Sequence, residues 1–291
     1  MGKYGIPYQG SKSSIADSII SFLPKGKRFV DLFGGGFAMS ECAHKSGKYE
    51  KVLYNELNPL LPALIKKAIK GDYNYNRYKP AFVSREEFDK KKDSDGYIKY
   101  IWSYSNSGKN YMFSDELEPK KRSLHNFVVF NIKDDFITKN FTDISNYIKG
   151  DDIYKRRILL LRYMKMKKAA RPLQELQELE ALERLQNLER LEQLERLEQL
   201  EIRNGSYLDY EYQDGDIVYC DPPYEGTAGY SGGFDSKAFY DWCISQPYQI
   251  WFSSYQISDK RFKMVWAKGK SNLMAGASGQ KQNYECIYTN K

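Results

Sequence analysis

The motif Asp221-Pro-Pro-Tyr224 combines residue types that can hold a planar amino group. Residues 217–220 have the apolar character of a buried strand, and the two prolines stiffen the turn that follows it. This turn should present the Asp221 carboxylate, the Pro222 carbonyl and the Tyr224 ring at the end of a strand, where ligands bind in open α/β sheets. Two oxygens can accept both N–H bonds of an NH2 group while the ring stacks on its plane. The motif therefore predicts a site for a planar amine.

A glycine run follows another apolar segment near the N-terminus. Residues 29–32 predict a strand, and the three glycines at 34–36 allow the backbone to turn sharply and approach a ligand. A helix should begin near Phe37 and end before Gly47. Strand, loop and helix start together form a cradle for a nucleotide-type ligand. The GxGxxG dinucleotide fingerprint is absent, because its third glycine position is not filled.

An acidic residue ends the next predicted strand. Residues 52–54 are apolar, and Asn55 and Glu56 follow them. Glu56 lies 25 positions after Asp31. In nucleotide-binding folds an acid that binds the ribose follows at a spacing of roughly 20 residues. Because a carboxylate can accept hydrogen bonds from both ribose hydroxyls, Glu56 is the predicted ribose acceptor.

Residues 66–171 interrupt the alternation of strands and helices. They carry 25 basic and 14 acidic side chains, a net charge of +11, as expected of a surface that contacts phosphates. Residues 100–113 mix aromatic side chains with amide, hydroxyl and basic ones around Gly108, and such groups can contact base edges and phosphates. Residues 153–170 predict a basic helix with one packed face. Its other face can lie along a DNA backbone or be solvated.

A leucine occupies every third position from 173 to 200. On an α-helix this stripe drifts by about 60° per leucine and cannot face one core, whereas on a 3-10 helix it stays aligned. Leu, Glu, Gln and Arg favour the α-helix, so we predict helical structure, with 3-10 as the rival. Residues 172–201 carry 3 basic and 9 acidic side chains, net −6, so this insertion should not contact DNA. Unpaired leucines would favour self-association.

The C-terminal quarter supplies further predicted elements. A glycine-rich loop over 226–234 follows the Asp221 motif, then a helix over 239–244 and a strand over 249–253. Residues 284–289 predict the last strand. Alternation in that strand exposes Glu285, so we expect it to lie at an edge of the sheet.

The cysteine and histidine content argues against other kinds of site. Only His44 and His125 are present, and the four cysteines form neither a CxxC pair nor a zinc pattern. This favours reduced thiols in a cytosolic protein. The chain also lacks an apolar run of about 18 residues, so we expect no membrane span. The cysteines are Cys42, Cys220, Cys243 and Cys286.

Together these motifs resemble the Dam-type enzymes, the D12 class, alpha group, of DNA N6-adenine methyltransferases. Asp221-Pro-Pro-Tyr224 is similar to the motif of enzymes that move a methyl group from S-adenosylmethionine to adenine N6 or cytosine N4, and the leading Asp is similar to the adenine enzymes. Phe33-Gly-Gly resembles their donor motif, and Tyr8-Gln-Gly-Ser-Lys12 their N-terminal motif. The order of donor loop, recognition insert and Asp-Pro-Pro-Tyr matches the alpha group.

The resemblance implies an α/β, Rossmann-like S-adenosylmethionine-dependent methyltransferase fold. Residues 1–65 and 202–291 would form the catalytic domain, 66–171 an inserted helical target-recognition domain, and 172–201 a leucine triplet-repeat helical insertion. The implied activity is site-specific methylation of adenine N6 in double-stranded DNA by base flipping, with S-adenosylmethionine as donor and no metal. The implied location is the cytoplasm, and the implied origin of the protein is a bacterium or a phage.

The resemblance also implies roles for individual residues. The implied catalytic residues are Asp221, Pro222 and Tyr224. The implied donor-binding residues are Tyr8, Lys12, Asp31, Phe33, Gly34, Gly35, Gly36, Glu56 and Asp221. The implied DNA-binding residues are Asn106, Gly108, Lys109 and Asn110.

Other readings use the same motifs. One is an N4-cytosine or RNA methyltransferase with the same chemistry. Another is a non-catalytic DNA-binding protein on this fold, with the repeat serving assembly. The intact Asp221, Tyr224 and Gly34 argue against the non-catalytic reading.

Overall fold

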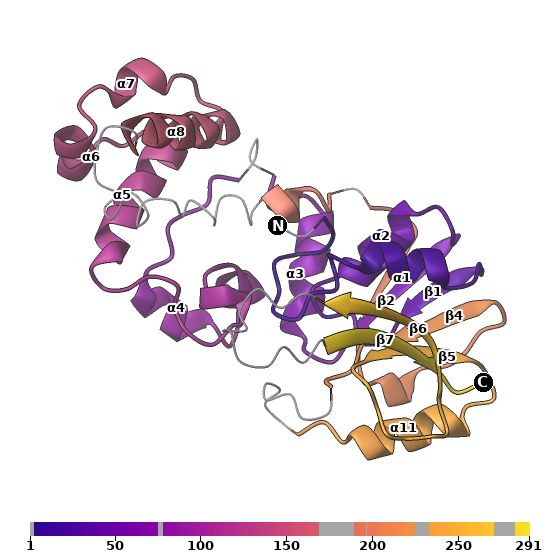
Figure 1. Ribbon diagram of the computed structural model, residues 1–291. Coiled ribbons are helices and arrows are strands. Elements are labelled where there is room, and N and C mark those ends of the chain that lie inside the picture. The colour runs from indigo at the N-terminus through magenta and orange to yellow at the C-terminus, as the bar shows by residue number, and fades with distance from the viewer. Residues whose placement is uncertain (1–2, 75–77, 169–188, 196, 225–232, 271–282) are drawn as a thin grey trace. The chain divides into compact units, whose positions relative to one another are not determined.

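The computed structural model describes residues 3–74, 78–168, 189–195, 197–224, 233–270 and 283–291 (Figure 1). Contacts divide the chain into two compact units. The first comprises residues 1–5, 11–62 and 198–291, and the second comprises residues 6–10 and 63–197.

The first unit is built on a sheet of seven strands in the order β3-β2-β1-β4-β5-β7-β6. Strands β1 to β5 pair in parallel, and β7 runs antiparallel to both β5 and β6. The predicted α/β fold is confirmed at this level, and a mostly parallel sheet of seven strands is consistent with a methyltransferase fold. The strands are β1 Arg28–Asp31, β2 Lys51–Glu56, β3 Leu200–Asn204, β4 Asp216–Cys220, β5 Ile250–Ser254, β6 Lys263–Lys270 and β7 Asn283–Thr289.

Helices cover both faces of this sheet. Alternate residues of each strand point to opposite faces, so their side chains form two separate hydrophobic cores. Helices α1 (Ala16–Phe22) and α2 (Ala38–Lys45) pack on the face that carries Tyr219. Helix α11 (Ser236–Ser245) packs on the opposite face, which carries Val218. The parallel strands are therefore buried on both sides, which explains their nearly continuous apolar sequences.

A buried ion pair joins the amino ends of β1 and β4. Arg28 Nε donates to Asp216 Oδ1 at 2.9 Å, and Arg28 Nη2 donates to Asp216 Oδ2 at 2.8 Å. The Tyr210 hydroxyl also donates to Asp216. The side chain of Asp216 is only 2% exposed. This bidentate pair sets the register between the two central strands at the end opposite the Asp221 motif.

The expectation that β7 is an edge strand with an exposed Glu285 is wrong. Strand β7 lies between β5 and β6, and Glu285 is 0% exposed. The sequence analysis did not predict β6, and it is β6 that takes the edge position. Glu285 therefore points into the unit and has to be paired there.

The second unit is helical in its described part, and the chain enters it within α3. Ser84 and Asp134 cap two of its helices, each accepting from the backbone N–H three residues later. Its helices are α3 Leu60–Ile69, α4 Arg85–Lys91, a π-helix Tyr97–Ile101, a 3-10 turn Tyr104–Asn106, α5 Leu117–Phe130, α6 Asp135–Asn140, α7 Ile144–Tyr147 and α8 Ile153–Lys168.

The basic helix α8 does not present all its cations to solvent. Arg156 is buried and donates to the Val128 carbonyl at 2.8 Å and to Asn131 Oδ1 at 2.9 Å, so it satisfies the C-terminal end of α5. Arg157 is also buried and pairs with Glu189 at 2.5 Å. These two arginines therefore belong to the packed side of the helix, because both side chains are buried within the unit.

Residues 173–188 and 196 of the leucine repeat lie outside the described residues. Its described end contains a helical turn at 189–192, and Leu191 and Leu194 are fully buried. Leu200 begins β3, so the helical prediction does not hold at the last leucine. Within the described chain, no helix has the length and apolarity needed to cross a membrane.

We expect Asp216→Asn to lower the free energy of unfolding by about 3 kcal/mol, because it leaves the largely buried Arg28 guanidinium with only the half-exposed Glu201 carboxylate, at 3.4 Å, as a charged partner. Urea denaturation measures this loss. Asp241→Asn is the matched control. It breaks an exposed pair with Arg261, in which the side chains are 52% and 42% exposed, and should cost less than about 1 kcal/mol. Equal losses for the two variants would contradict the role assigned to the buried pair.

Candidate active site

Four polar side chains of the first unit meet beyond the carboxyl end of β4. Lys12 Nζ lies 2.8 Å from Asp221 Oδ1 and 3.5 Å from Glu285 Oε1. The Tyr224 hydroxyl lies 3.1 Å from Asp221 Oδ1 and also hydrogen-bonds to Glu285. The Lys12 ammonium sits 4.7 Å from the centroid of the Tyr224 ring, within cation–π range. We call these four residues the carboxylate cluster.

The topology of the sheet brings the cluster together. Asp221 follows β4 directly, and it shares the side of Tyr219, whose hydroxyl is hydrogen-bonded to Ser253 of β5. Because β7 is antiparallel to β5, its first residues lie at the carboxyl end of β5, where Ser254 pairs with Cys286. Glu285 therefore reaches the same end of the sheet as Asp221, although 64 positions separate them in the sequence.

The cluster is largely withdrawn from water. Side-chain exposure is 7% for Lys12, 18% for Asp221 and 0% for Glu285. Burial lowers the pKa of Lys12, but the charges of Asp221 and Glu285 outweigh burial and leave that pKa raised. Burial also raises the pKa of Asp221, and the Lys12 ammonium opposes this shift. Burial holds the pKa of Tyr224 well above its usual value, so Tyr224 stays a neutral phenol.

A second acid stands at the end of β1, close to the glycine run. The Ser40 hydroxyl donates to Asp31 Oδ2 at 2.7 Å. Asp31 Oδ1 is buried and has no hydrogen-bond partner among the described residues. Burial raises the pKa of Asp31 to about 7, and the charges of Asp221 and Glu56 add to the shift. An unsatisfied buried oxygen at this point can accept a hydrogen bond from a ligand.

The glycine run forms a tight cradle between β1 and α2. Gly35 has φ +44°, and its N–H donates to Glu56 Oε2 at 2.9 Å. The other Glu56 oxygen accepts from the Asn58 N–H at 2.9 Å. A Cβ on Gly34 would lie 2.1 Å from the Tyr54 ring, so no larger residue fits there without moving Tyr54. Burial raises the pKa of Glu56.

Other predicted donor-binding residues have different surroundings. The Phe33 ring stacks on Tyr207 with centroids 5.2 Å apart. Gly36 is covered closely by Gly5, where a Cβ would lie 2.3 Å from the Gly36 carbonyl. Tyr8 belongs to the second unit, and its ring packs edge-on against Tyr100 with centroids 5.3 Å apart. The structure thus brings Lys12, Asp221 and Tyr224 together, whereas Tyr8 groups with the other unit.

The predicted DNA-binding loop lies in the second unit, between Ser103 and Tyr111, which form a bridge. Asn106 Nδ2 donates to the Tyr100 carbonyl at 2.7 Å, so its amide helps shape the loop. Gly108 has φ +72°, a conformation that favours glycine, and its N–H donates to Ser103 Oγ at 2.8 Å. The exposed side chains of this loop are those of Tyr104, Ser105, Lys109 and Asn110.

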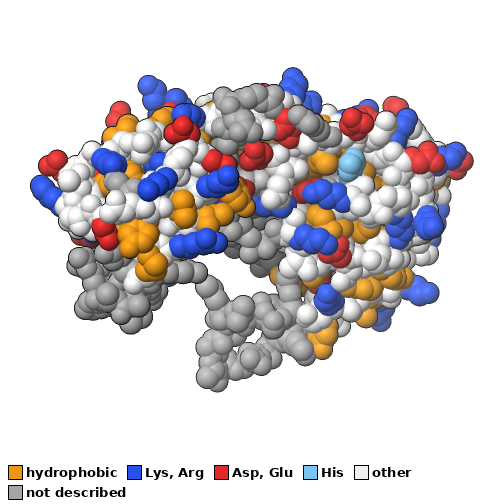
Figure 2. Space-filling view, turned by 90° about the horizontal axis from the view of Figure 1, so that it is seen from above, with side chains coloured by type: hydrophobic (Ala, Val, Ile, Leu, Met, Phe, Trp, Pro, Cys, Tyr) orange, Lys and Arg blue, Asp and Glu red, His pale blue; other side chains and the backbone are white. Residues whose placement is uncertain are grey.

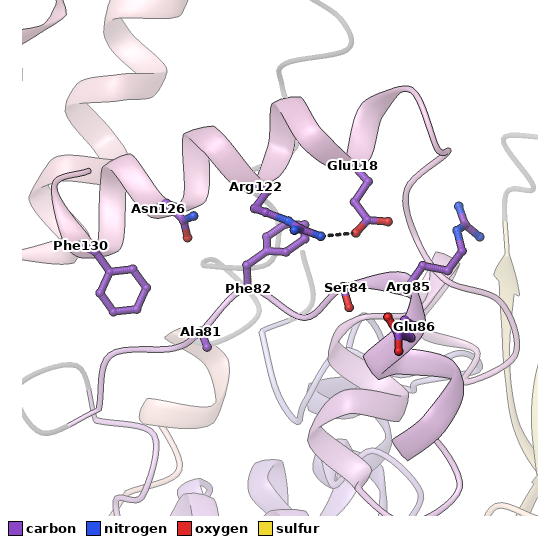
Figure 3. A pocket seen from close by; sticks show the side chains of 9 residues that line it. All are labelled: Ala81, Phe82, Ser84, Arg85, Glu86, Glu118, Arg122, Asn126 and Phe130. Atoms are coloured by element: carbon purple, nitrogen blue, oxygen red, sulfur yellow. Dashed lines mark hydrogen bonds and ion pairs between the residues drawn. The ribbon is translucent and has the colours of Figure 1, made fainter. Parts of the chain in front are cut away.

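The second unit also contains a groove of about 700 Å³ that the sequence analysis did not predict (Figure 3). Arg122 crosses it, paired with Glu118 at 2.7 Å and stacked over Phe82 at 5.4 Å. The groove is lined by Ala81, Phe82, Ser84, Arg85, Glu86, Glu118, Arg122, Asn126 and Phe130. On the face drawn in Figure 2, basic and acidic side chains are interspersed, so the positive charge is not gathered into one patch there.

Sequence reasoning missed Glu285 as a member of the site. The available signal was an acidic residue beside the apolar stretch 286–288, within a predicted strand. Alternation alone assigned it to the exposed face. Only the antiparallel insertion of β7 between two strands reverses that assignment.

The mostly parallel sheet of seven strands is consistent with a methyltransferase fold, and the carboxylate cluster lies after its fourth strand. Residues 8–241 match the family described as D12 class N6 adenine-specific DNA methyltransferase. The chain belongs to this family and is an adenine-specific DNA methyltransferase. Comparison with curated proteins gave no match.

The raised pKa of Asp31 predicts a pH-dependent stability. A carboxyl group whose pKa rises from 3.8 to about 7 on folding stabilises the fold below pH 4, and this contribution is lost as the pH rises to about 7. The free energy of unfolding of the wild type, minus that of Asp31→Asn, should therefore fall over this range, by at most about 4 kcal/mol. Urea titrations of both proteins without ligand test this. A difference that does not change with pH would contradict it.

Proposed function

We propose that this enzyme transfers a methyl group from S-adenosylmethionine to N6 of a specific adenine in double-stranded DNA, with the adenine turned out of the helix. The observation that carries the proposal is the buried Asp221 carboxylate, held by Lys12 and Tyr224 at the carboxyl end of β4. Membership of an adenine-specific DNA methyltransferase family supports the substrate.

The residues of the first unit fit S-adenosylmethionine. The glycine cradle allows close approach of a ligand, and Glu56 at the end of β2 offers a carboxylate to ribose hydroxyls. Asp31 Oδ1 offers a buried acceptor that the described protein does not satisfy. When bound, S-adenosylmethionine supplies an electrophilic methyl carbon attached to a positively charged sulfur.

The residues of the carboxylate cluster suit an amine nucleophile. Adenine N6 is stacked and paired inside a duplex, so the base has to be extruded before these side chains can reach it. Asp221 and the Pro222 carbonyl would accept the two N6 hydrogens, which draws the nitrogen lone pair out of conjugation with the ring. The base would stack on Tyr224, whose own ring is held edge-on by Tyr255 at 4.7 Å.

Asp221 acts chiefly on the charge that develops during transfer. The amine becomes positive as it gains the methyl group, and a preorganised carboxylate stabilises that charge. One N6 proton then leaves, and Asp221, as its hydrogen-bond acceptor, can receive it. Holding the amine and the methyl carbon in contact contributes much of the remaining acceleration.

For DNA contact we propose the loop between Ser103 and Tyr111. Asn106 and Gly108 give the loop its shape, and the exposed Lys109 and Asn110 contact the duplex. A lysine supplies a phosphate contact, and an asparagine can read a base edge.

The test is transfer of labelled methyl from S-adenosylmethionine to duplex DNA, single-stranded DNA and RNA, followed by digestion to nucleosides. We expect label in N6-methyldeoxyadenosine from duplex DNA. Label only in RNA, or in N4-methyldeoxycytidine, would contradict the proposed substrate. Binding of S-adenosylmethionine, measured by calorimetry, tests the donor independently of transfer.

Asp221→Ala should abolish methyl transfer, by about a thousandfold or more, because it removes the acceptor that stabilises the amine cation. Affinity for S-adenosylmethionine should stay within about threefold of wild type. Activity within tenfold of wild type would contradict the role of Asp221.

Lys109→Gln should weaken binding to all duplexes alike and reduce the slope of log affinity against log salt by about one unit, because one phosphate contact is lost. Fluorescence anisotropy at several salt concentrations measures this slope. Lys139→Gln, which changes another exposed lysine of the same unit, is the control and should leave the slope unchanged. Identical slopes for wild type and Lys109→Gln would exclude this contact.

A further inference from the structure

Glu285 is a fully buried carboxylate that contacts two other members of the carboxylate cluster. Its Oε1 atom lies 3.5 Å from Lys12 Nζ and is hydrogen-bonded to the Tyr224 hydroxyl. It also lies outside the residues 8–241 that match the family. A glutamate buried at 0% exposure is costly unless its charge is used or neutralised.

The charge of the cluster depends on this residue. Lys12 and Asp221 alone form a neutral pair at 2.8 Å, and a neutral pair offers little to an amine that becomes positive. A second carboxylate on the same ammonium gives the cluster a net charge of −1. The Tyr224 hydroxyl contacts both carboxylates but can donate its single proton to only one of them at a time.

We propose that Glu285 is a positioning residue for methyl transfer: it holds the Lys12 ammonium and the Tyr224 hydroxyl, so that Lys12 does not fully neutralise the cluster and a net negative charge faces the amine. This inference rests on the proposed role of Asp221. It also explains why a charged side chain is buried at the end of the sheet where β4 and β5 finish and β7 begins.

Few charged groups surround Asp221 in the described part of the chain. The groups that interact electrostatically with its carboxylate include Lys12, Glu285, Tyr224, Asp31, Tyr219 and Cys220. Of these only Lys12 is a cation, and the phenols and the thiol are neutral because burial raises their pKa values. Glu285 is therefore the carboxylate that offsets Lys12 at short range.

The first test is Glu285→Gln, which keeps the shape of the side chain and removes its charge. Per folded molecule, kcat should fall 10- to 100-fold, while KM for S-adenosylmethionine and for DNA stays within threefold. Glu41→Gln is the matched control. Glu41 is another fully buried glutamate paired with a lysine, Lys45, at 2.5 Å. It also accepts from the Gly5 N–H at 2.5 Å, a bond that the glutamine oxygen retains, so its variant should keep kcat within threefold of wild type.

The second readout is the pH dependence of kcat. The charge of Glu285 raises the pKa of Asp221, so Glu285→Gln should move the acid limb of the profile to lower pH. The third is the double variant Lys12→Met with Glu285→Gln, measured at saturating donor and DNA and above the acid limb of its own pH profile, because loss of Lys12 raises the pKa of Asp221. It restores the net charge of −1 on Asp221 and should recover kcat at least fivefold over Glu285→Gln.

The outcomes separate this inference from the proposed function. If Asp221→Ala abolishes transfer but Glu285→Gln stays within twofold of wild type, only the role of Glu285 is overturned. If Glu285→Gln is slow but its acid limb does not move and the double variant shows no recovery, Glu285 is purely structural and the charge argument is overturned. If Asp221→Ala remains active, the proposed role of Asp221 is contradicted, and the inference about Glu285 falls with it.

Discussion

Two carboxylates and an ammonium are buried together at the carboxyl end of β4, and buried charges have to be paired. Much of the first unit can be understood from this requirement. The chain before α1 delivers Lys12, whose position is fixed by a hydrogen bond from the Ile15 N–H to the Lys12 carbonyl at 2.9 Å. Strand β7 delivers Glu285 from the opposite end of the sequence. Pro222 and Pro223 follow β4 and form the stiff link between Asp221 and Tyr224.

The sheet separates its stabilising charges from its reactive ones. At the amino ends of β1 and β4, the bidentate pair of Arg28 and Asp216 is satisfied entirely within the protein. At the carboxyl ends, Asp31 retains an oxygen without a partner among the described residues, and Asp221 is shared by competing groups. An end with fully satisfied charges stabilises the fold, whereas an end with unsatisfied acceptors is ready to bind a ligand.

The parts of the fold with strong local signals were predictable. Apolar runs located β1, β2, β4 and β5, and the local chemistry of the Asp221 motif and the glycine run led to the candidate site. Pairing between distant segments was not predictable. Glu285 was assigned to the surface because alternation cannot show that β6 covers β7. The packed side of the helix over 153–170 was not predicted to include Arg156, because composition cannot show that Arg156 satisfies the end of α5.

A crystal structure of the enzyme with S-adenosylhomocysteine and a duplex containing its methylation site would show directly whether Asp221 and the Pro222 carbonyl hold the target amine. We expect an extruded adenine against the Tyr224 ring, with N6 within hydrogen-bond distance of both acceptors. Lys12 should remain between Asp221 and Glu285. A target base bound away from the carboxylate cluster, or an adenine whose N6 contacts neither acceptor, would contradict the account.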